Sequence, residues 1–153
     1  MNNLFLKTFG LFKVPLIFFV SPKIIKLDDH ITEIKIPLSW KTKNHLKSMY
    51  FGALCVGADL AAGIVAMKYI KQSKKNVHLS FKELNVEFLK RAMGATHFYC
   101  DQNEEIQSFV NEVINNPGIR KNKIVKIVAK CPEISEEEVA VFKLSLSLKY
   151  KLI

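Results

Sequence analysis

The chain has 153 residues, enough for one domain with a real core and few for two. Hydrophobic residues make up 49% and charged residues 24%, which is typical of a globular protein and excludes extensive disorder. The net charge of +9 is spread along the chain without a nucleic-acid recognition motif, so we expect no nucleic-acid partner, although basic surface could attract an anionic ligand.

Three cysteines, Cys55, Cys100 and Cys131, have neither the spacing of a zinc site nor that of a disulfide framework. We therefore expect no metal, free thiols and a reducing, cytoplasmic location.

The first expected element is a helix over residues 3–13, because its apolar side chains share one broad face. The apolar run Val14–Val20 follows Lys7 and Lys13 and imitates a secretory signal, but no cleavage site of small residues comes after it. We expect this helix to pack against the domain. Binding of the helix to a membrane surface is the alternative.

A strand is expected over residues 31–38, since Ile34, Ile36 and Leu38 recur at every second position. A helix from about 51 to 70 follows, and it is apolar on all sides, which is typical of a buried helix. Its apolar run is shorter than the roughly 20 residues that cross a bilayer, so we expect no transmembrane segment.

Asp59 is the one acidic residue of this apolar helix. A carboxylate in a buried helix must be paired, protonated or used in chemistry, because burial of an unpaired charge is costly. A structural role for such an acid is about as common as a catalytic one. Asp59 is therefore the residue whose position most needs an explanation.

The second half of the chain is rich in alternating patterns. Residues 77–89 alternate with a one-residue slip at Lys82-Glu83, which indicates a β-bulge, and residues 95–100 form a further short strand. The segment from Asp101 to Glu104 has the pattern of a capping box that opens an amphipathic helix over 103–115.

Two more strands are expected, over residues 123–131 and over about 140–150. The last strand has the clearest alternation of the chain. The side chains expected to face the core are Ala140, Phe142, Leu144, Leu146, Leu148 and Tyr150. Those expected to face solvent are Lys143, Ser145, Ser147, Lys149 and Lys151.

One wholly apolar helix among strands with a single apolar face favours an α+β fold, in which a curved antiparallel sheet wraps around that helix. A doubly wound parallel sheet would instead need strands that are apolar on both faces and alternate with helices. No linker or repeat divides the chain, so we expect a single domain over residues 1–153, with the helix 3–13 outside the sheet.

The segment from Asn44 to Asp59 resembles the signature of phenylacetate-degradation-type hotdog thioesterases, whose fold is a helix inside a curled antiparallel sheet. That signature has an Asn six residues before a His-Gly-Gly and a catalytic Asp nine residues after the His. The positions of this chain that match it without a gap are Asn44, Gly52, Leu54, Ala58 and Asp59. Tyr50 and Phe51 replace the His and the first Gly, so the chain is most similar to an uncharacterised branch with a Tyr-Phe-Gly motif. A looser match covers residues 84–92.

The resemblance implies hydrolysis of an acyl thioester, usually of coenzyme A, without a cofactor, at two equal sites across a homodimer interface. It does not decide between a dimer and a tetramer. Asp59 would act as general base or nucleophile, and the helix start at Phe51 and Gly52 would form the oxyanion hole. Tyr50 would donate its hydroxyl to the substrate where the family has an imidazole, and Asn44 would orient the water or the acid.

Other interpretations stay open for some of these residues. Asn44 has the residue type of a turn, and Tyr50 that of a packing aromatic at a helix start. The alternative function is a non-catalytic module that binds acyl-CoA or an acyl carrier protein, since the His-Gly pair is missing. A dehydratase of the same fold is less favoured, because its His and acid pair has no counterpart here.

Overall fold

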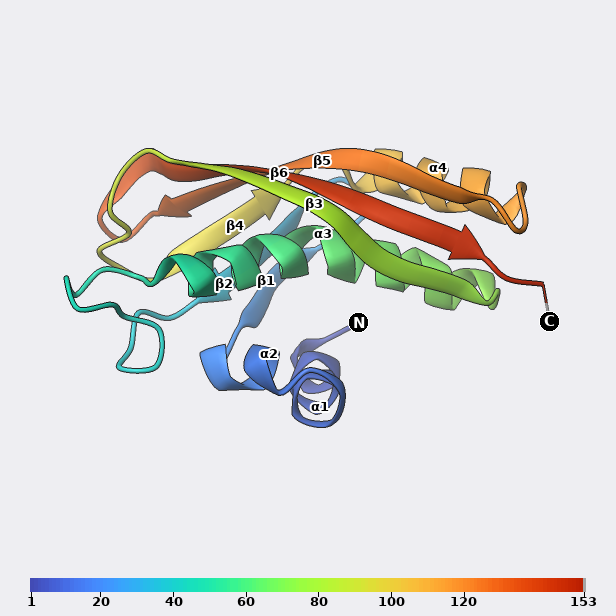
Figure 1. Cartoon of the computed structure of the whole chain (residues 1–153). Coiled ribbons are helices and arrows are strands. Elements are labelled where there is room, and N and C mark those ends of the chain that lie inside the picture. The colour runs from blue at the N-terminus through green and yellow to red at the C-terminus, as the bar shows by residue number, and fades with distance from the viewer. Residues whose placement is uncertain (153) are drawn as a thin grey trace.

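A six-stranded antiparallel sheet curves around helix α3 (Phe51–Ser73) in this computed structural model, which describes residues 1–152 (Figure 1). This is the expected α+β hotdog arrangement. The strands, in the order in which they lie in the sheet, are β1 (Lys23–Leu27), β2 (Thr32–Ile36), β4 (Thr96–Cys100), β5 (Arg120–Cys131), β6 (Ser135–Tyr150) and β3 (Val77–Phe88).

Helix α3 forms the centre of the core because its small apolar side chains allow neighbouring elements to pack closely against it. Ala58, Ala61 and Ile64 are fully buried, and the sheet covers one side of the helix (Figure 1). A Cβ atom at Gly57 would lie 2.2 Å from the Phe98 ring of β4, so only glycine fits there. By length and composition α3 could cross a membrane, but 67% of its most apolar window is buried within the fold, which makes it a core helix.

Strand β3 lies at one edge of the sheet and pairs only with β6. The pairing shifts between Phe81 and Glu83, which confirms the predicted bulge. Because of this shift the inner face carries Leu79 and Phe81 before the bulge and Leu84 after it. The outer edge of this long strand has no partner within residues 1–152.

Two short elements near the amino terminus complete the fold. Helix α1 (Asn3–Lys13) is followed by helix α2 (Pro15–Val20), which occupies the apolar run that imitates a secretory signal. The two helices lie beneath α3, on the side opposite the sheet (Figure 1). Leu6, Ile17 and Val20 anchor them in the core.

Helix α4 (Asn103–Ile114) begins where the sequence predicts, but the predicted capping box is wrong. Gln102 is the N-cap and makes no side-chain capping bond. Its amide oxygen instead accepts a hydrogen bond of 2.7 Å from the Lys126 backbone N–H, while the buried Asn103 side chain bonds Thr32. Tertiary partners thus replace the local cap.

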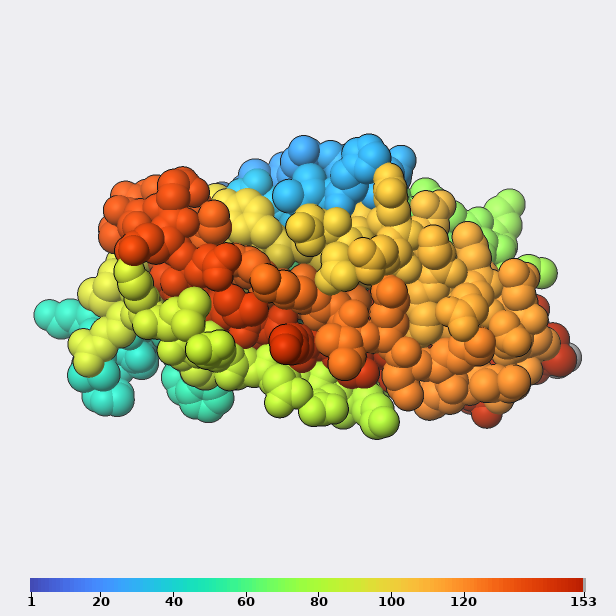
Figure 2. Space-filling view, turned by 90° about the horizontal axis from the view of Figure 1, so that it is seen from above, coloured from blue at the N-terminus to red at the C-terminus, as the bar shows by residue number. Residues whose placement is uncertain are grey.

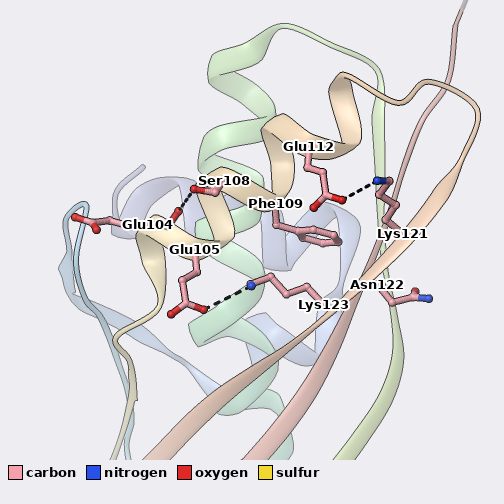
Figure 3. A pocket seen from close by; sticks show the side chains of 8 residues that line it. All are labelled: Glu104, Glu105, Ser108, Phe109, Glu112, Lys121, Asn122 and Lys123. Atoms are coloured by element: carbon pink, nitrogen blue, oxygen red, sulfur yellow. Dashed lines mark hydrogen bonds and ion pairs between the residues drawn. The ribbon is translucent and has the colours of Figure 1, made fainter.

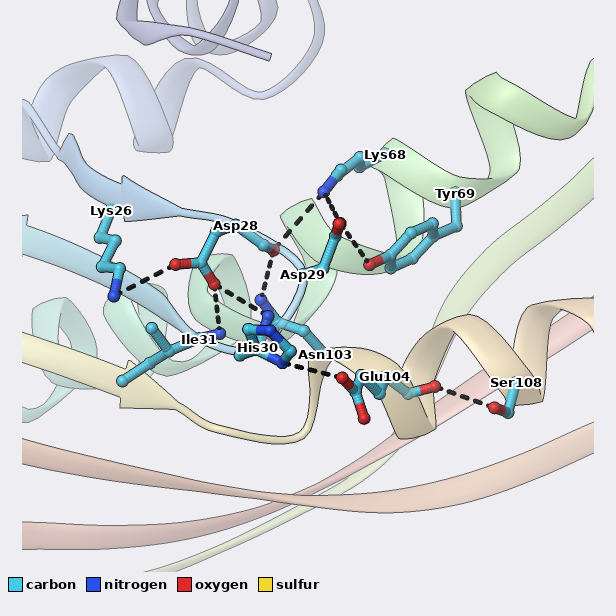
Figure 4. Close-up of polar contacts among 10 residues, drawn as sticks. All are labelled: Lys26, Asp28, Asp29, His30, Ile31, Lys68, Tyr69, Asn103, Glu104 and Ser108. Atoms are coloured by element: carbon cyan, nitrogen blue, oxygen red, sulfur yellow. Dashed lines mark hydrogen bonds and ion pairs between the residues drawn. The ribbon is translucent and has the colours of Figure 1, made fainter.

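The turn between β1 and β2 is fixed by polar contacts to both α3 and α4 (Figure 4). The Asp28 carboxylate accepts two backbone hydrogen bonds of 2.8 Å, from His30 and Ile31, and these bonds lower the pKa of Asp28. Asp29 lies 2.8 Å from Lys68 of α3, and the Asn103 amide donates to the Asp28 carbonyl at 3.0 Å. These contacts tie the edge strand β1 to the helices.

The inner face of β6 matches the alternation of its sequence, but the expected exposure of Ser145 and Ser147 is wrong, since both are buried. The Arg120 guanidinium donates a hydrogen bond of 3.0 Å to the Ser147 hydroxyl and covers it. Small side chains in the middle of a sheet are covered by longer neighbours on adjoining strands. Atoms of β5 and β6 cross the middle of this outer face (Figure 2).

Candidate functional site

The Asp59 side chain lies on the face of α3 that is turned toward the edge strand β3. A Cβ atom built at Gly63, one helical turn further on, would lie 3.4 Å from Asp59 Oδ1 and 3.2 Å from Cζ of Phe81. The carboxylate and the Phe81 ring therefore meet over the bare backbone of Gly63. Asp59 is directed toward the open edge of the sheet and away from the centre of the core.

The Asp59 carboxylate is partly buried and makes no hydrogen bond or ion pair within residues 1–152. Burial raises the pKa of Asp59 to about 6, because desolvation disfavours the charged form. An acid with a pKa in this range can accept a proton near neutral pH, as a general base must.

The start of α3 presents backbone N–H groups without acceptors. Tyr50 is the N-cap, and its carbonyl accepts hydrogen bonds from Ala53 and Leu54 at 3.0 and 3.2 Å. The N–H groups of Phe51 and Gly52 have no acceptor in the described part of the chain. Together with the helix dipole, they favour negative charge at this end of the helix.

Two backbone hydrogen bonds fix the segment that leads into α3. The Tyr50 N–H donates to the Thr42 carbonyl at 2.7 Å, and the Met49 N–H donates to the Ala92 carbonyl at 2.8 Å. Ala92 belongs to the turn after β3 that carries the looser sequence likeness. The helix start is therefore tied to the loop that precedes it and to the end of the edge strand.

Aromatic rings surround the helix start. The Tyr50 ring packs against Gly52, where a Cβ atom would lie 2.5 Å from the ring, and its centre is 4.7 Å from that of Phe51. The Phe51 ring in turn meets Phe88 of β3 edge-on, at 6.5 Å between ring centres. The helix start therefore opens toward the same strand as Asp59.

Asn44 lies in the turn before α3. Its amide oxygen accepts hydrogen bonds from the backbone N–H groups of Leu46 (2.9 Å) and Ser48 (3.2 Å), and its amide nitrogen donates to the Ser48 hydroxyl at 3.0 Å. The side chain thus closes the turn over residues 44–48, and its described hydrogen bonds all stay within that turn.

The structure brings Tyr50, Phe51 and Gly52 together and places Asp59 two turns further along the same helix. At 1.5 Å per residue, the eight positions from Phe51 to Asp59 span about 12 Å. Sequence reasoning missed Phe81 and Phe88, which face the acid and the helix start from β3. Their alternation within residues 77–89 places them on one strand face but does not say which helix that face meets.

Hollows of the surface also lie away from these residues. One of about 670 Å³ lies between α4 and β5 and is open to solvent (Figure 3). Its walls carry the ion pairs Glu112–Lys121 (2.6 Å) and Glu105–Lys123 (3.5 Å). Such exposed ion pairs are typical of a groove that is filled with water. Within residues 1–152, no three His, Cys, Asp or Glu side chains are grouped to hold a metal ion.

The chain belongs to the DUF4442 family, described as a domain of unknown function, whose model matches residues 2–143. A search of curated proteins gave no match.

Solved structures share the fold over almost the whole chain. A protein of unknown function from Chlorobaculum tepidum has a TM-score of 0.81 at 14% identity, covering 96% of this chain and 93% of its own. A Pseudomonas aeruginosa protein named "probable thioesterase" has a TM-score of 0.77 at 18% identity, with coverages of 98% and 97%. A thioesterase from Haemophilus influenzae has a TM-score of 0.61 at 13% identity, with coverages of 86% and 80%. At these identities the likeness shows the hotdog fold and leaves the chemistry to the residues.

Proposed function

We propose that this protein is an acyl-thioester hydrolase, with acyl-CoA as its substrate class and Asp59 as its reactive acid. The observation that carries the proposal is the partly buried Asp59 carboxylate, which has no partner within residues 1–152 and is directed toward the open side of β3. The names of two fold relatives as thioesterases agree with this chemistry. Within the hotdog thioesterases we assign the chain to a branch with Tyr-Phe-Gly at positions 50–52, acting in the cytoplasm.

The reaction needs two groups that α3 supplies. Asp59 takes a proton from water as the water oxygen attacks the thioester carbonyl carbon, or its carboxylate attacks that carbon and forms an anhydride that water then hydrolyses. The carbonyl oxygen becomes negative and is held by the N–H groups of Phe51 and Gly52. The C–S bond then breaks, and the thiolate leaves and takes up a proton, giving a free thiol and a carboxylic acid.

The two groups are about 12 Å apart in one chain, too far to act on one carbonyl, so we place the site between two copies. In a two-fold dimer the helix start of one copy faces Asp59 of the other, which gives two equal sites.

The edge strand β3 supports this dimer. The inner-face side chains Phe81, Leu84 and Phe88 are 41%, 37% and 48% exposed, although they belong to the apolar face of the sheet. A long edge strand that bears apolar side chains is a template for pairing with another strand. Pairing with β3 of a second copy would cover these side chains and enclose Asp59.

Tyr50 and Asn44 have supporting places in this proposal. The Tyr50 ring borders the helix start and contacts the acyl group near the carbonyl. Asn44 is a positioning residue, because its hydrogen bonds shape the turn that delivers Tyr50 to the helix start.

The test is steady-state hydrolysis of short, medium, long and aromatic acyl-CoAs by the purified protein, with Asp59→Asn and Asp59→Ala beside the wild type. We expect turnover of at least one substrate class and a loss of about 100-fold or more in both variants. Circular dichroism of both Asp59 variants confirms that they fold. Turnover that both variants retain at the wild-type rate would rule out Asp59.

A second candidate function is a non-catalytic acyl-CoA binding protein. It is favoured by the Tyr50 ring, which packs on Gly52 and borders the N–H groups that would hold the oxyanion. Calorimetry with the same acyl-CoAs distinguishes the two, since tight binding without turnover supports this second candidate.

A further inference from the structure

A large apolar surface lies on helices α1 and α2 and on the loop that contains Trp40. We call it the amino-terminal patch and define it by its exposed side chains, which are Phe12, Leu16, Phe18, Phe19 and Trp40. Phe12 is 76% exposed and Trp40 73%, both high for aromatic residues. Helices α1 and α2, which carry most of the patch, lie on the side of α3 opposite the sheet (Figure 1).

Close contacts join parts of the patch. Phe19 and Trp40 meet edge to face, with ring centres 6.1 Å apart. Helices α1 and α2 touch closely, because a Cβ atom at Gly10 would lie 2.8 Å from the Phe18 backbone nitrogen. An exposed apolar surface of this kind marks an interaction site.

Lysines surround the patch. The Lys41 ammonium lies 5.3 Å from the centre of the Phe19 ring and 5.8 Å from that of Trp40. With Lys7 and Lys23 it borders a hollow of about 330 Å³ that has an apolar floor. None of these three lysines forms an ion pair with a carboxylate in residues 1–152.

The sequence of this region contains no acid. Residues 1–27 include four lysines and neither Asp nor Glu, and residues 34–58 likewise include four lysines and no acid. The fold brings these two segments together at the Phe19–Trp40 contact. The surface therefore combines exposed apolar side chains with lysines beside Phe18, Phe19 and Trp40.

We propose that the amino-terminal patch binds the surface of an anionic lipid bilayer. Its aromatic and aliphatic side chains enter the interfacial layer, while Lys7, Lys23 and Lys41 meet headgroup phosphates. The protein is held on the bilayer without crossing it, since α3 stays in the core. This binding does not depend on the hydrolase proposal.

A second copy of the chain fits the patch less well than a bilayer does. Two patches placed face to face would bring their lysines together without an acid to neutralise them, and like charges repel. An anionic bilayer offers both the apolar layer and the opposite charge.

The experiment uses the full chain and its single tryptophan, Trp40, as the probe. The protein is mixed with vesicles of phosphatidylcholine alone, or of phosphatidylcholine with phosphatidylglycerol, and both fluorescence and co-sedimentation are measured. We expect a blue shift of Trp40 emission and co-sedimentation with the anionic vesicles only, both weakened by salt. Equal binding to the two vesicle types, or none to either at low salt, overturns the proposal.

Charge variants test whether the lysines beside the patch are the ones that meet the bilayer. Lys23→Glu with Lys41→Glu should weaken partitioning by at least about 30-fold, since each lysine near an anionic surface contributes about 1 kcal/mol, or about fivefold. The control pair is Lys126→Glu with Lys143→Glu, on the paired strands β5 and β6. It changes the net charge by the same amount and should bind vesicles as the wild type does. If both pairs weaken binding alike, net charge alone is responsible and the patch is not the site.

Apolar variants test the centre of the patch. Phe19→Ser with Trp40→Ser should lose co-sedimentation, while Ile124→Ser, a 65% exposed side chain of β5, should keep it. Light scattering runs beside both, with circular dichroism to confirm folding. If the double variant has a smaller oligomer than the wild type, the patch is an interface between copies and the membrane proposal is wrong.

Discussion

At Asp59, the burial that makes the acid unfavourable for folding also gives it a pKa suited to proton transfer. Its neighbours over Gly63 are apolar, and no described cation or N–H group offsets the loss of water. A partly buried acid with a raised pKa and no described partner is a candidate for a functional site. The residue therefore allows two separate predictions, one for activity and one for stability.

The first prediction concerns the pH dependence of activity. Asp59 must be ionised to act as base or nucleophile, so kcat/KM should fall about tenfold per pH unit below about 6 and level off above it. Initial rates with the best acyl-CoA across this range measure the effect. A profile that is flat through pH 6 would show that ionisation of Asp59 does not control the rate.

The second prediction concerns stability. The ordinary pKa of an aspartate is 3.8, and that of Asp59 in the fold is about 6, so the folded state binds more protons and loses stability as pH rises between these values. Asp59→Asn should thus match the wild type in acid and have a free energy of unfolding up to about 3 kcal/mol higher above pH 6. Urea unfolding at both pH values measures this. A variant less stable than the wild type at neutral pH would mean that Asp59 has a stabilising partner.

The sequence singled out Asp59 because one acid within an apolar helix is visible without a structure. It could not show what surrounds the acid, since Gly63 and Phe81 are brought to it by packing. Asn44 shows the same limit, because its residue type fits both a turn and a site, and only coordinates reveal its bonds to Leu46 and Ser48.

At the scale of elements, α3 and β3 together carry the residues of the proposed site. Two glycines of α3 that look alike in the sequence have different surroundings. Gly57 faces the buried Phe98, while Gly63 faces the half-exposed Phe81. This difference makes a matched pair of variants informative.

The third prediction is that Gly57→Ala lowers the free energy of unfolding by about 1–3 kcal/mol, because its Cβ would overlap the Phe98 ring. Gly63→Ala should be neutral or stabilising by up to about 1 kcal/mol, since alanine favours the helix and Phe81 has room to shift. Thermal unfolding of the two variants measures the difference. Equal effects at both positions would contradict the packing described for α3.

The fourth prediction concerns β3. Leu84→Glu should place a charge in the apolar inner face of the edge strand, and the proposed dimer should then dissociate with loss of turnover. Size-exclusion chromatography with light scattering measures the mass, and Ile124→Glu on β5 is the control. A monomeric Leu84→Glu protein with wild-type activity would exclude a site between copies.

Periodicity predicted most elements because each strand of the second half has one face against the core. It missed β1, whose five residues alternate poorly and are mostly exposed. It placed the start of β5 at Lys123, whereas the strand begins at Arg120. The first residues of β5 pair with β6 but lie outside the core, so they are polar and show no alternation of apolar side chains. The strand order was also beyond its reach, because alternation identifies faces and not neighbours.

At the scale of the whole molecule, the proposed site needs two chains, and each chain contributes a different half. Phe51→Pro removes one candidate N–H donor, and proline is tolerated at the first position of a helix. The backbone of Tyr50, at φ −64° and ψ 137°, already has the conformation that precedes a proline. This variant and Asp59→Asn therefore damage opposite halves of the site.

The fifth prediction is that Phe51→Pro and Asp59→Asn proteins, each inactive alone, regain activity when they are unfolded and refolded together. A mixed dimer has one intact site, so recovery should approach about a quarter of the wild-type rate for two-fold dimers. Mixing Asp59→Asn with Asp59→Ala is the control and should restore nothing. Failure of the first mixture, with mixed dimers shown by mass spectrometry, would place the site within one chain.

Helix α3 has a consequence for how this protein can acquire new substrates. Helix α3 carries Asp59, and most of its other side chains are buried in the core. A substitution in α3 that changes the shape of the proposed site should therefore also lower the free energy of unfolding. The opposite wall of the proposed site is β3, whose inner-face side chains Phe81, Leu84 and Phe88 are partly exposed, so exchange of one apolar side chain for another there should cost less stability. Among relatives with different substrates, we therefore expect the residues of β3 to differ more than those of α3.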